Sequence, residues 1–315
     1  MSSFSLSSPS IEITLNWLDF SVHYNTFTSL FKFCDTAQSL LFPTGVTKEQ
    51  VALHTMWSNN CVMRSNSAKL FLPHQQYANW RNIRIFPRLK AVGNTSWTCA
   101  FRVVRSDASH DATLLAVVET TMVATNDTHT TSVPIEYRDT LIAMIQQTSQ
   151  QPLCLNRTVF SKKREQYFSQ TQRVRMTDCD SLNHINNAIY ATLAEETRLH
   201  AAFQNKYDRC SSSQEQDHNQ VGSQATECAI SYIGQAHPFE EMEVITWSEH
   251  LSSGGGSGTT CGGSNQKSGN TSASTSSVDV AAIGIGSDQI EYRTDFYVNG
   301  NIVSQTSLKC AASKL

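Results

Sequence analysis

The stretch that decides the fold is Arg173–Phe203, which reads RVRMTDCDSLNHINNAIYATLAEETRLHAAF. The alternating run Val174–Met176 at its start predicts a strand. A helical pattern follows the polar turn and continues to Phe203. The turn between strand and helix holds two acids, a histidine and several amides, whereas a helix N-terminus needs only one Asp or Asn as its cap. The turn therefore predicts a functional site.

The apolar residues of this helix share one broad face when they are placed at 100° per residue. They are Ile185, Ile189, Leu193, Leu199 and Phe203. Because Glu196 and His200 fall inside the same arc, we expect both side chains to face the core. Glu196 is then either an acid partner for a substrate or half of a buried ion pair with Arg173 or Arg175.

The turn resembles the signature of the hotdog-fold thioesterases, D-x-D-x-x-G-H-x-N-N-x-x-Y followed by E-E, as found in the 4-hydroxybenzoyl-CoA and acyl-ACP thioesterase groups. The matching residues are Asp178, Asp180, His184, Asn186, Asn187, Tyr190, Glu195 and Glu196. Asn183 replaces the glycine, and because Asn tolerates positive φ we expect the turn to form. The resemblance implies an α+β fold, an antiparallel sheet wrapped around a central helix, and an enzyme that hydrolyses an acyl thioester.

The reaction requires a base or nucleophile, together with donors for the oxyanion that forms on the thioester carbonyl. A helix N-terminus supplies free amides and a positive dipole. In this family the second acid of D-x-D faces the thioester, which assigns that role to Asp180. The resemblance also implies an amide donor near Asn187, with His184 and Asn186 orienting water or Asp180. Two alternatives stay open, in which Asp180 is only a helix cap and His184 only a hydrogen-bonded core histidine.

The other signature residues receive different expectations. Asp178 is expected to hold the turn, Tyr190 to pack, and Glu196 to belong to the catalytic set. Cys179 lies between the two acids, but in a strand its side chain points away from its neighbours, which argues against a nucleophile.

The signature returns 161 residues earlier in a weaker form. Asp19, His23 and Asn25 correspond to Asp180, His184 and Asn186. The same shift aligns later pairs, among them Asp35 with Glu196, Phe71 with Tyr232, Ile83 with Val244 and Phe86 with Trp247. A constant shift over this length indicates a tandem duplication. Trp17, Val22 and Thr26 replace signature residues in the first copy, so we expect the second copy to carry most activity and a second site at Asp19, His23 and Asn25 to contribute less.

The expected organisation is two tandem hotdog domains. A flexible tail spans 1–10, the N-terminal domain 11–145, a linker 146–164 and the C-terminal domain 165–315, with a flexible Ser/Gly-rich insert at 252–277. Helices are expected over 27–42 and 135–145, and strands over 11–18, 68–74, 80–92, 96–105 and 113–125 in the first copy. Strands are expected over 227–233, 242–250, 278–285, 289–298 and 302–311 in the second, with Asn299-Gly300 as a type I′ hairpin turn.

Composition narrows the classes of partner. A net charge of −3 gives no general attraction to nucleic acid. The sequence has no run of eighteen apolar residues, so no membrane-spanning helix is expected. Nine cysteines without a C-x-x-C pair argue against a disulfide framework and a zinc site, and we expect neither metal nor cofactor. The first ten residues lack the basic and apolar regions of a secretory signal.

The final tripeptide Ser313-Lys314-Leu315 matches the peroxisomal address S-K-L, which predicts binding to a peroxisomal import receptor. The expected location is a peroxisome or a similar organelle such as a glycosome, with the cytoplasm as the alternative. We expect an acyl-CoA substrate and a pseudo-dimer within one chain, which can assemble further into homo-oligomers. Two rival functions stay open: a non-catalytic acyl-thioester binding or scaffold protein, and a hotdog enoyl-CoA hydratase. The hydratases carry a G-D-x-N-P-type segment, which is absent here.

Overall fold

The computed structural model describes residues 10–15, 26–38, 41, 61–71, 82–106, 113–126, 129–146, 167–180, 182–204, 225–251 and 289–311. Several expectations fall outside these ranges. They are the linker from residue 147, the insert 252–277, the strand over 278–285 and the C-terminal tripeptide, together with Asp19, His23 and Asn25. Among the helices in the described ranges, none has the length and apolar character needed to cross a bilayer.

One antiparallel sheet runs through the described chain in the order β1-β3-β4-β5-β2-β8-β11-β10-β9-β7, with β6 paired to β5. Its first half comprises β1 (Ile11–Thr14), β2 (Cys61–Leu70), β3 (Asn82–Val92), β4 (Ser96–Arg105), β5 (Leu114–Asn126) and β6 (His129–Thr130). Its second half comprises β7 (Phe168–Arg173), β8 (Ala225–Tyr232), β9 (Glu241–Leu251), β10 (Gln289–Val298) and β11 (Asn301–Ala311). Read outward from the β2–β8 junction, both halves follow the same order, which is the topology that a tandem duplication produces.

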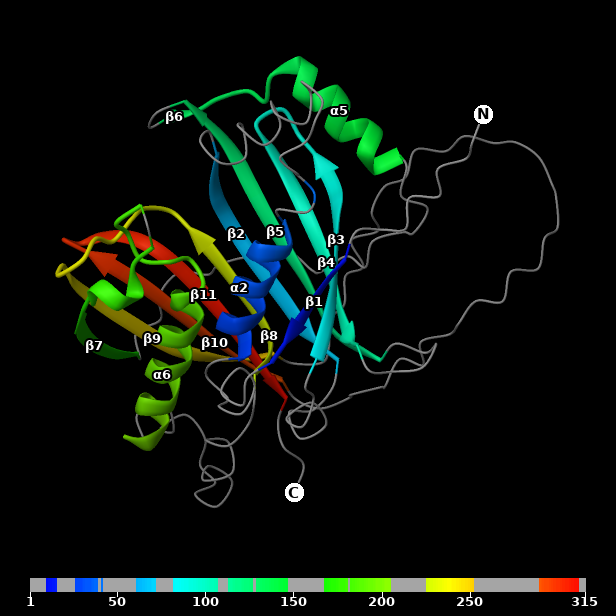
Figure 1. Cartoon of the computed structure of the whole chain (residues 1–315). Helices are drawn as coiled ribbons and strands as arrows, with labels where there is room; N and C mark the ends of the chain where they lie inside the picture. Colours follow the sequence, from blue (N-terminus) through cyan, green and yellow to red (C-terminus); the bar gives the residue numbers. More distant parts are fainter. Residues whose placement is uncertain are drawn as a thin grey trace, which may run out of the picture.

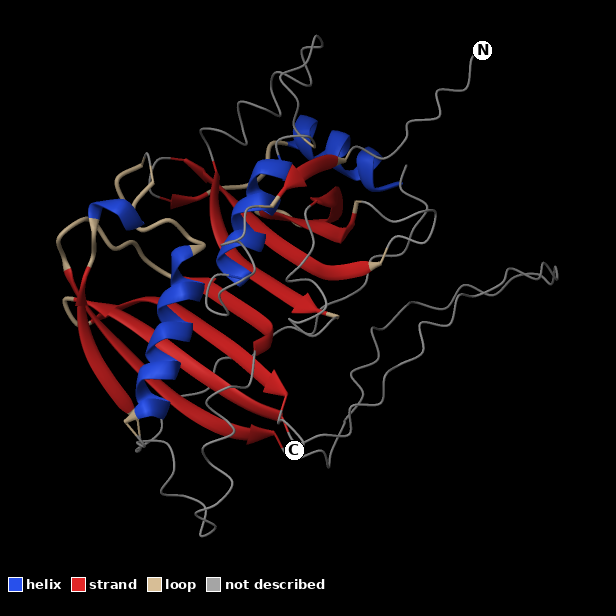
Figure 2. Cartoon of the chain, turned by 60° about the horizontal axis from the view of Figure 1, so that its bottom comes forward, coloured by secondary structure: helices blue, strands red, loops and turns tan. Residues whose placement is uncertain are grey.

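Each half of the sheet carries one long helix on the same side, as Figures 1 and 2 show. Helix α2 (Thr26–Gln38) packs on β3 and β5, and α6 (Ile189–Phe203) packs on β8 to β11. A further helix, α5 (Ile135–Gln146), lies against β3. The expected α+β fold of two tandem hotdog units, each a helix wrapped by an antiparallel sheet, is confirmed.

The core follows from the two periodicities of the sequence. Helix α2 buries Phe27, Leu30, Phe31 and Cys34, which recur at the spacing of one helix face. Strand β3 alternates half-buried and buried residues over most of its length, as a strand with one core face must. Burial of each large apolar side chain stabilises the fold by about 1.5–3 kcal/mol.

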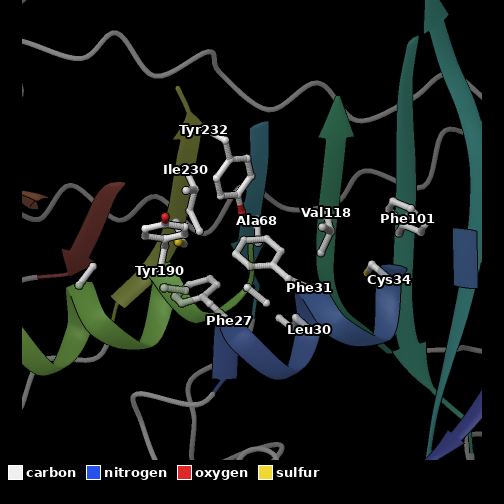
Figure 3. Close-up of a cluster of buried hydrophobic side chains, with 14 of the residues drawn as sticks. Phe27, Leu30, Phe31, Cys34, Ala68, Phe101, Val118, Tyr190, Ile230 and Tyr232 are labelled. Atoms are coloured by element: carbon white, nitrogen blue, oxygen red, sulfur yellow. The ribbon is translucent and has the colours of Figure 1, made fainter. Parts of the chain in front are cut away.

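The N-terminal ends of α2 and α6 meet in front of the junction between the two sheet halves. Figure 3 shows Phe27 and Phe31 of α2 beside Tyr190 of α6. The Thr28 hydroxyl donates to the Ala188 carbonyl at 3.0 Å and lies 2.5 Å from the Thr192 hydroxyl. The first turn of α2 therefore contacts the start of the helix that follows the signature turn.

The expected buried face of α6 is wrong in part. Glu196 and His200 are exposed, and Phe203 is 75% exposed, whereas Leu193 is buried as expected. The buried face instead consists of Tyr190, Ala191, Leu193, Ala194, Glu195, Thr197, Arg198 and Ala201. The physical reason is that Glu195 and Arg198 form a paired unit at 2.7 and 2.8 Å, which enters the core with its charges compensated. A prediction based on apolar residues alone does not count such a pair as core, and it therefore assigns the wrong face of α6 to the core.

The strand expected at Val174–Met176 is also wrong, because β7 ends at Arg173 and a 3₁₀ turn, η2 (Met176–Asp178), follows. Asp178 causes this turn, since its carboxylate accepts the Arg175 backbone N–H at 3.2 Å and the guanidinium at 2.9 and 3.0 Å. The strand expected over 68–74 is misplaced as well, because β2 spans Cys61–Leu70. Two other expectations hold closely. Strands β4 and β10 have the expected bounds, and Asn299 and Gly300 have φ values of 50° and 76°, as a type I′ turn requires.

Candidate active site

The signature residues form a tight turn between β7 and α6. The Asp180 N–H donates to the His184 carbonyl at 3.0 Å, and the Asn183 N–H donates to the Asp180 carbonyl at 3.1 Å. Asn183 has a φ of 61°, which is the left-handed conformation expected of the residue in the glycine position. Asp178 is buried beneath the turn and accepts the Asn186 N–H on its backbone carbonyl at 2.8 Å, in keeping with its expected structural role.

Asp180 and His184 lie together at the mouth of this turn. One carboxylate oxygen of Asp180 accepts the Leu182 N–H at 2.8 Å, and the other is 3.4 Å from His184 Nδ1. The two side chains are 25% and 15% exposed, so both remain accessible to a small reactant. Asp180 does not cap α6, because the helix begins at Ile189 and Ala188 occupies the cap position. His184 Nδ1 thus lies between two acceptors, the second carboxylate oxygen at 3.4 Å and the Ile185 carbonyl at 3.2 Å.

The backbone N–H groups just before α6 differ in whether they have a hydrogen-bond acceptor. Ala188 N–H donates to the Asn186 side-chain oxygen at 3.0 Å, and Ile189 N–H to the Asn186 carbonyl at 2.9 Å. The Asn187 N–H, in contrast, has no acceptor among the described residues. It stands just before the helix N-terminus, where the dipole favours negative charge. Asn187 is thus the amide in the expected position with its donor available to an anion.

Glu196 lies on a neighbouring cavity of about 240 Å³. The cavity is lined by Gln172, Arg173, Val174, Arg175, Asp178, Ile185, Leu193, Glu196 and Met242. Although Glu196 is exposed, partial desolvation of its carboxyl at the cavity raises its pKa; the positive charge of Arg175 opposes that rise, and the negative charge of Asp178 adds to it. Arg175 binds Asp178, and Arg173 donates to the Phe239 carbonyl at 3.3 Å, so Glu196 shares this cavity with both arginines and does not form the buried pair that was one of its two expected roles.

Two contributions to the site escaped the sequence reasoning. Asp35 on α2, which the sequence indicates only as the repeat equivalent of Glu196, has a pKa that is raised by desolvation and further raised by the negative charge of Asp180. Tyr232 donates its hydroxyl to the Asn187 carbonyl at 2.8 Å from β8. No local sequence pattern indicates either effect, because both depend on how distant segments are placed in the fold.

The remaining candidates behave as their surroundings dictate. Burial and the charges of Asp178 and Asp180 raise the pKa of the Cys179 thiol, which disfavours a thiolate nucleophile there. His200 bonds to Gln170 at 2.8 Å and to Gln204 at 2.6 Å on the exposed side of α6. Within the part of the chain that the structure describes, no group of three or more His, Cys, Asp or Glu side chains is placed to hold a metal ion.

Comparison with known proteins shows which proteins the chain is similar to. The model of the thioesterase-like superfamily matches residues 174–261. An acyl-ACP thioesterase from Bacteroides thetaiotaomicron aligns with a TM-score of 0.60 at 11% identity, covering 96% of this chain and 97% of that one. The 12:0-ACP thioesterase from Umbellularia californica aligns with a TM-score of 0.59 at 11% identity, covering 97% of each chain. No curated protein matches by sequence. The resemblance to the hotdog-fold thioesterases is thereby confirmed, since the chain shares its fold with solved thioesterases over almost its whole length and its second repeat, which holds the signature turn, matches the thioesterase-like superfamily.

Proposed function

We propose that this chain hydrolyses an acyl thioester at the turn before α6. The observation that carries the proposal is the meeting of three groups within eight residues. Asp180 and His184 lie 3.4 Å apart as a carboxylate–imidazole pair, and the Asn187 N–H, seven residues after Asp180 in the same turn, is available to an anion. A thioester hydrolase needs a base and an oxyanion donor side by side, and this turn offers both.

The residues divide the work as follows. Asp180 takes a proton from a water molecule, whose oxygen attacks the thioester carbonyl carbon. The carbonyl oxygen becomes negatively charged and accepts the Asn187 N–H. When the tetrahedral intermediate collapses, the carbon–sulfur bond breaks, and the thiolate leaves and receives the proton held by Asp180. His184 keeps Asp180 in the orientation that faces the reacting carbon. The products are a free acid and a thiol.

The carrier we propose is coenzyme A, and the cellular setting is fatty-acyl metabolism in a peroxisome-like organelle. Support for the setting comes from Ser313-Lys314-Leu315, which would engage a peroxisomal import receptor. The two rival functions predict different behaviour. A binding or scaffold protein would hold acyl-CoA without releasing thiol, and a hydratase would add water to an enoyl-CoA without releasing thiol.

The test compares the wild-type chain with Asp180→Asn on a panel of acyl-CoAs, with thiol release and enoyl-CoA hydration measured in parallel. Because the Asn side-chain oxygen can still accept the Leu182 N–H, the turn should persist. Loss of the base should lower thiol release by about 10²-fold or more. Asp19→Asn should cost clearly less, and an equal loss would show that both repeats are active. Full activity in a well-folded Asp180→Asn enzyme would refute the assignment.

A further inference from the structure

A buried chain of hydrogen bonds runs from the first repeat into the signature turn of the second. The Thr120 hydroxyl on β5 donates to the Asn66 side-chain oxygen on β2 at 2.8 Å. The Asn66 side-chain amide donates to the Tyr232 hydroxyl at 3.2 Å, and that hydroxyl donates to the Asn187 carbonyl at 2.8 Å. Thr120 and Asn66 are each 3% exposed and Tyr232 is 6% exposed. We call these residues the Thr120–Asn66–Tyr232 relay.

Only one direction of proton donation satisfies this relay. The Asn187 carbonyl can only accept, so the single Tyr232 proton must point to it. The Tyr232 oxygen then accepts from the Asn66 NH₂ group, which turns the Asn66 side-chain oxygen toward Thr120. Since each member is buried, a reversed or broken bond would leave a polar group unsatisfied away from water. The relay therefore fixes the direction of its last bond.

That last bond acts on the peptide plane that follows Asn187. This plane contains the Asn187 carbonyl and the Ala188 N–H. The Tyr232 hydroxyl donates to the carbonyl, and the Ala188 N–H donates to the Asn186 side-chain oxygen. The plane before Asn187 is held by the bond from the Ile189 N–H to the Asn186 carbonyl. With both planes held, the available Asn187 N–H has a fixed direction.

We propose that Tyr232, aligned by Asn66 and Thr120 of the first repeat, is a positioning residue that keeps the Asn187 amide aimed at the oxyanion. This inference rests on the proposed function, because it assigns the oxyanion to that amide. The first repeat thus serves the site of the second through side chains that touch no reacting atom. Removal of an oxyanion donor lowers kcat by about 10²–10³-fold. Because Asn186 still restrains the turn, loss of the Tyr232 hydroxyl should cost less, about tenfold in kcat.

The experiment compares Tyr232→Phe with the matched control Tyr190→Phe. The two tyrosines are packed together with ring centroids 5.9 Å apart, and Tyr190 is 2% exposed, but its hydroxyl bonds to no described residue. We expect Tyr232→Phe to lower kcat for acyl-CoA hydrolysis about tenfold, with KM within about twofold, and Tyr190→Phe to leave both unchanged. Hydrogen exchange of the peptide over 182–189 should accelerate in Tyr232→Phe alone. A purely structural role would instead lower the thermal midpoint without a selective loss of kcat.

A second variant tests the relay as a unit. Thr120→Val should lower kcat by less than Tyr232→Phe, and the double variant should be no slower than Tyr232→Phe, because members of one chain are not additive. The proposal is overturned if Tyr232→Phe keeps kcat within about twofold of wild type, if Tyr190→Phe loses as much, or if the two losses multiply. If the wild-type chain releases no thiol, the proposed function fails, and unchanged hydrogen exchange in Tyr232→Phe would then overturn the positioning role separately.

Discussion

The ion pair between Glu195 and Arg198 gives a prediction whose size follows from its burial. The two side chains are 5% and 2% exposed, and two hydrogen bonds of 2.7 and 2.8 Å join them. The Arg198 guanidinium also lies 5.1 Å from the centre of the Tyr292 ring. Glu195→Gln preserves shape but leaves the Arg198 charge in the core without its countercharge.

The expected loss is large because the remaining charge cannot reach water. Removal of one partner of a buried pair costs about 3–5 kcal/mol. For a chain of this size, at roughly 2 °C per kcal/mol, the thermal midpoint should fall by about 6–10 °C. The double variant Glu195→Leu/Arg198→Met removes both charges and should lie within about 1 kcal/mol of wild type or above it. Urea unfolding followed by circular dichroism measures the free energy of unfolding of the wild type, Glu195→Gln and the double variant.

The matched control is Glu12→Gln, which makes the same chemical change in a surface pair. Glu12 lies 3.0 Å from Arg84, and their side chains are 47% and 43% exposed. Because water screens that pair, its loss should cost no more than about 1 kcal/mol. If Glu195→Gln were no more destabilising than Glu12→Gln, burial of the pair would not govern its energetics and the reasoning would fail.

Three shorter predictions concern the turn, the cavity and the tail. The pKa of Glu196 is raised in the folded state, so its contribution to stability is fully present below about pH 4.5 and is lost as pH rises through the folded-state pKa. The thermal midpoint of Glu196→Gln should therefore rise relative to that of the wild type between pH 4 and pH 7. A difference in midpoint that stays constant with pH would contradict this. Asn183→Gly should leave stability nearly unchanged, whereas Asn183→Val should lose about 1–3 kcal/mol in urea unfolding because φ is 61°; equal stabilities would argue against strain. Removal of Leu315 should leave a tagged protein in the cytosol with full activity in the lysate, and continued import under the microscope would remove the support for the address.

Much of the fold can be predicted from local sequence patterns. The bounds of β4 and β10 follow from runs of strand-forming residues between turn signals, and Asn299-Gly300 has the φ values that its hairpin needs. The duplication followed from a constant shift, and the shared strand order of the two halves agrees with it. These features depend on neighbours within a few residues or on comparison of the chain with itself.

What was missed depends on partners that are remote or charged. Periodicity placed Glu196 in the core instead of Glu195, because it gave no weight to a compensated pair with Arg198. A strand was expected at Val174–Met176, but the Asp178 carboxylate bends the backbone there into η2. The contact of Tyr232 with Asn187 requires β2 and β8 to pair, and no local pattern reports that pairing.

The β2–β8 junction has a consequence for how the protein can evolve. In a symmetric dimer of single repeats, a substitution beside the two-fold axis occurs on both sides of it. A tandem chain is free of that constraint. A shift of 161 residues makes Phe71 the repeat equivalent of Tyr232, and Asn66 that of Glu227. Glu227 binds Lys69 at 2.9 Å and Lys309 at 3.0 Å instead of joining a relay. One side of the junction can thus specialise in holding a catalytic turn while the other side specialises in joining strands, a division of labour that identical subunits could not achieve.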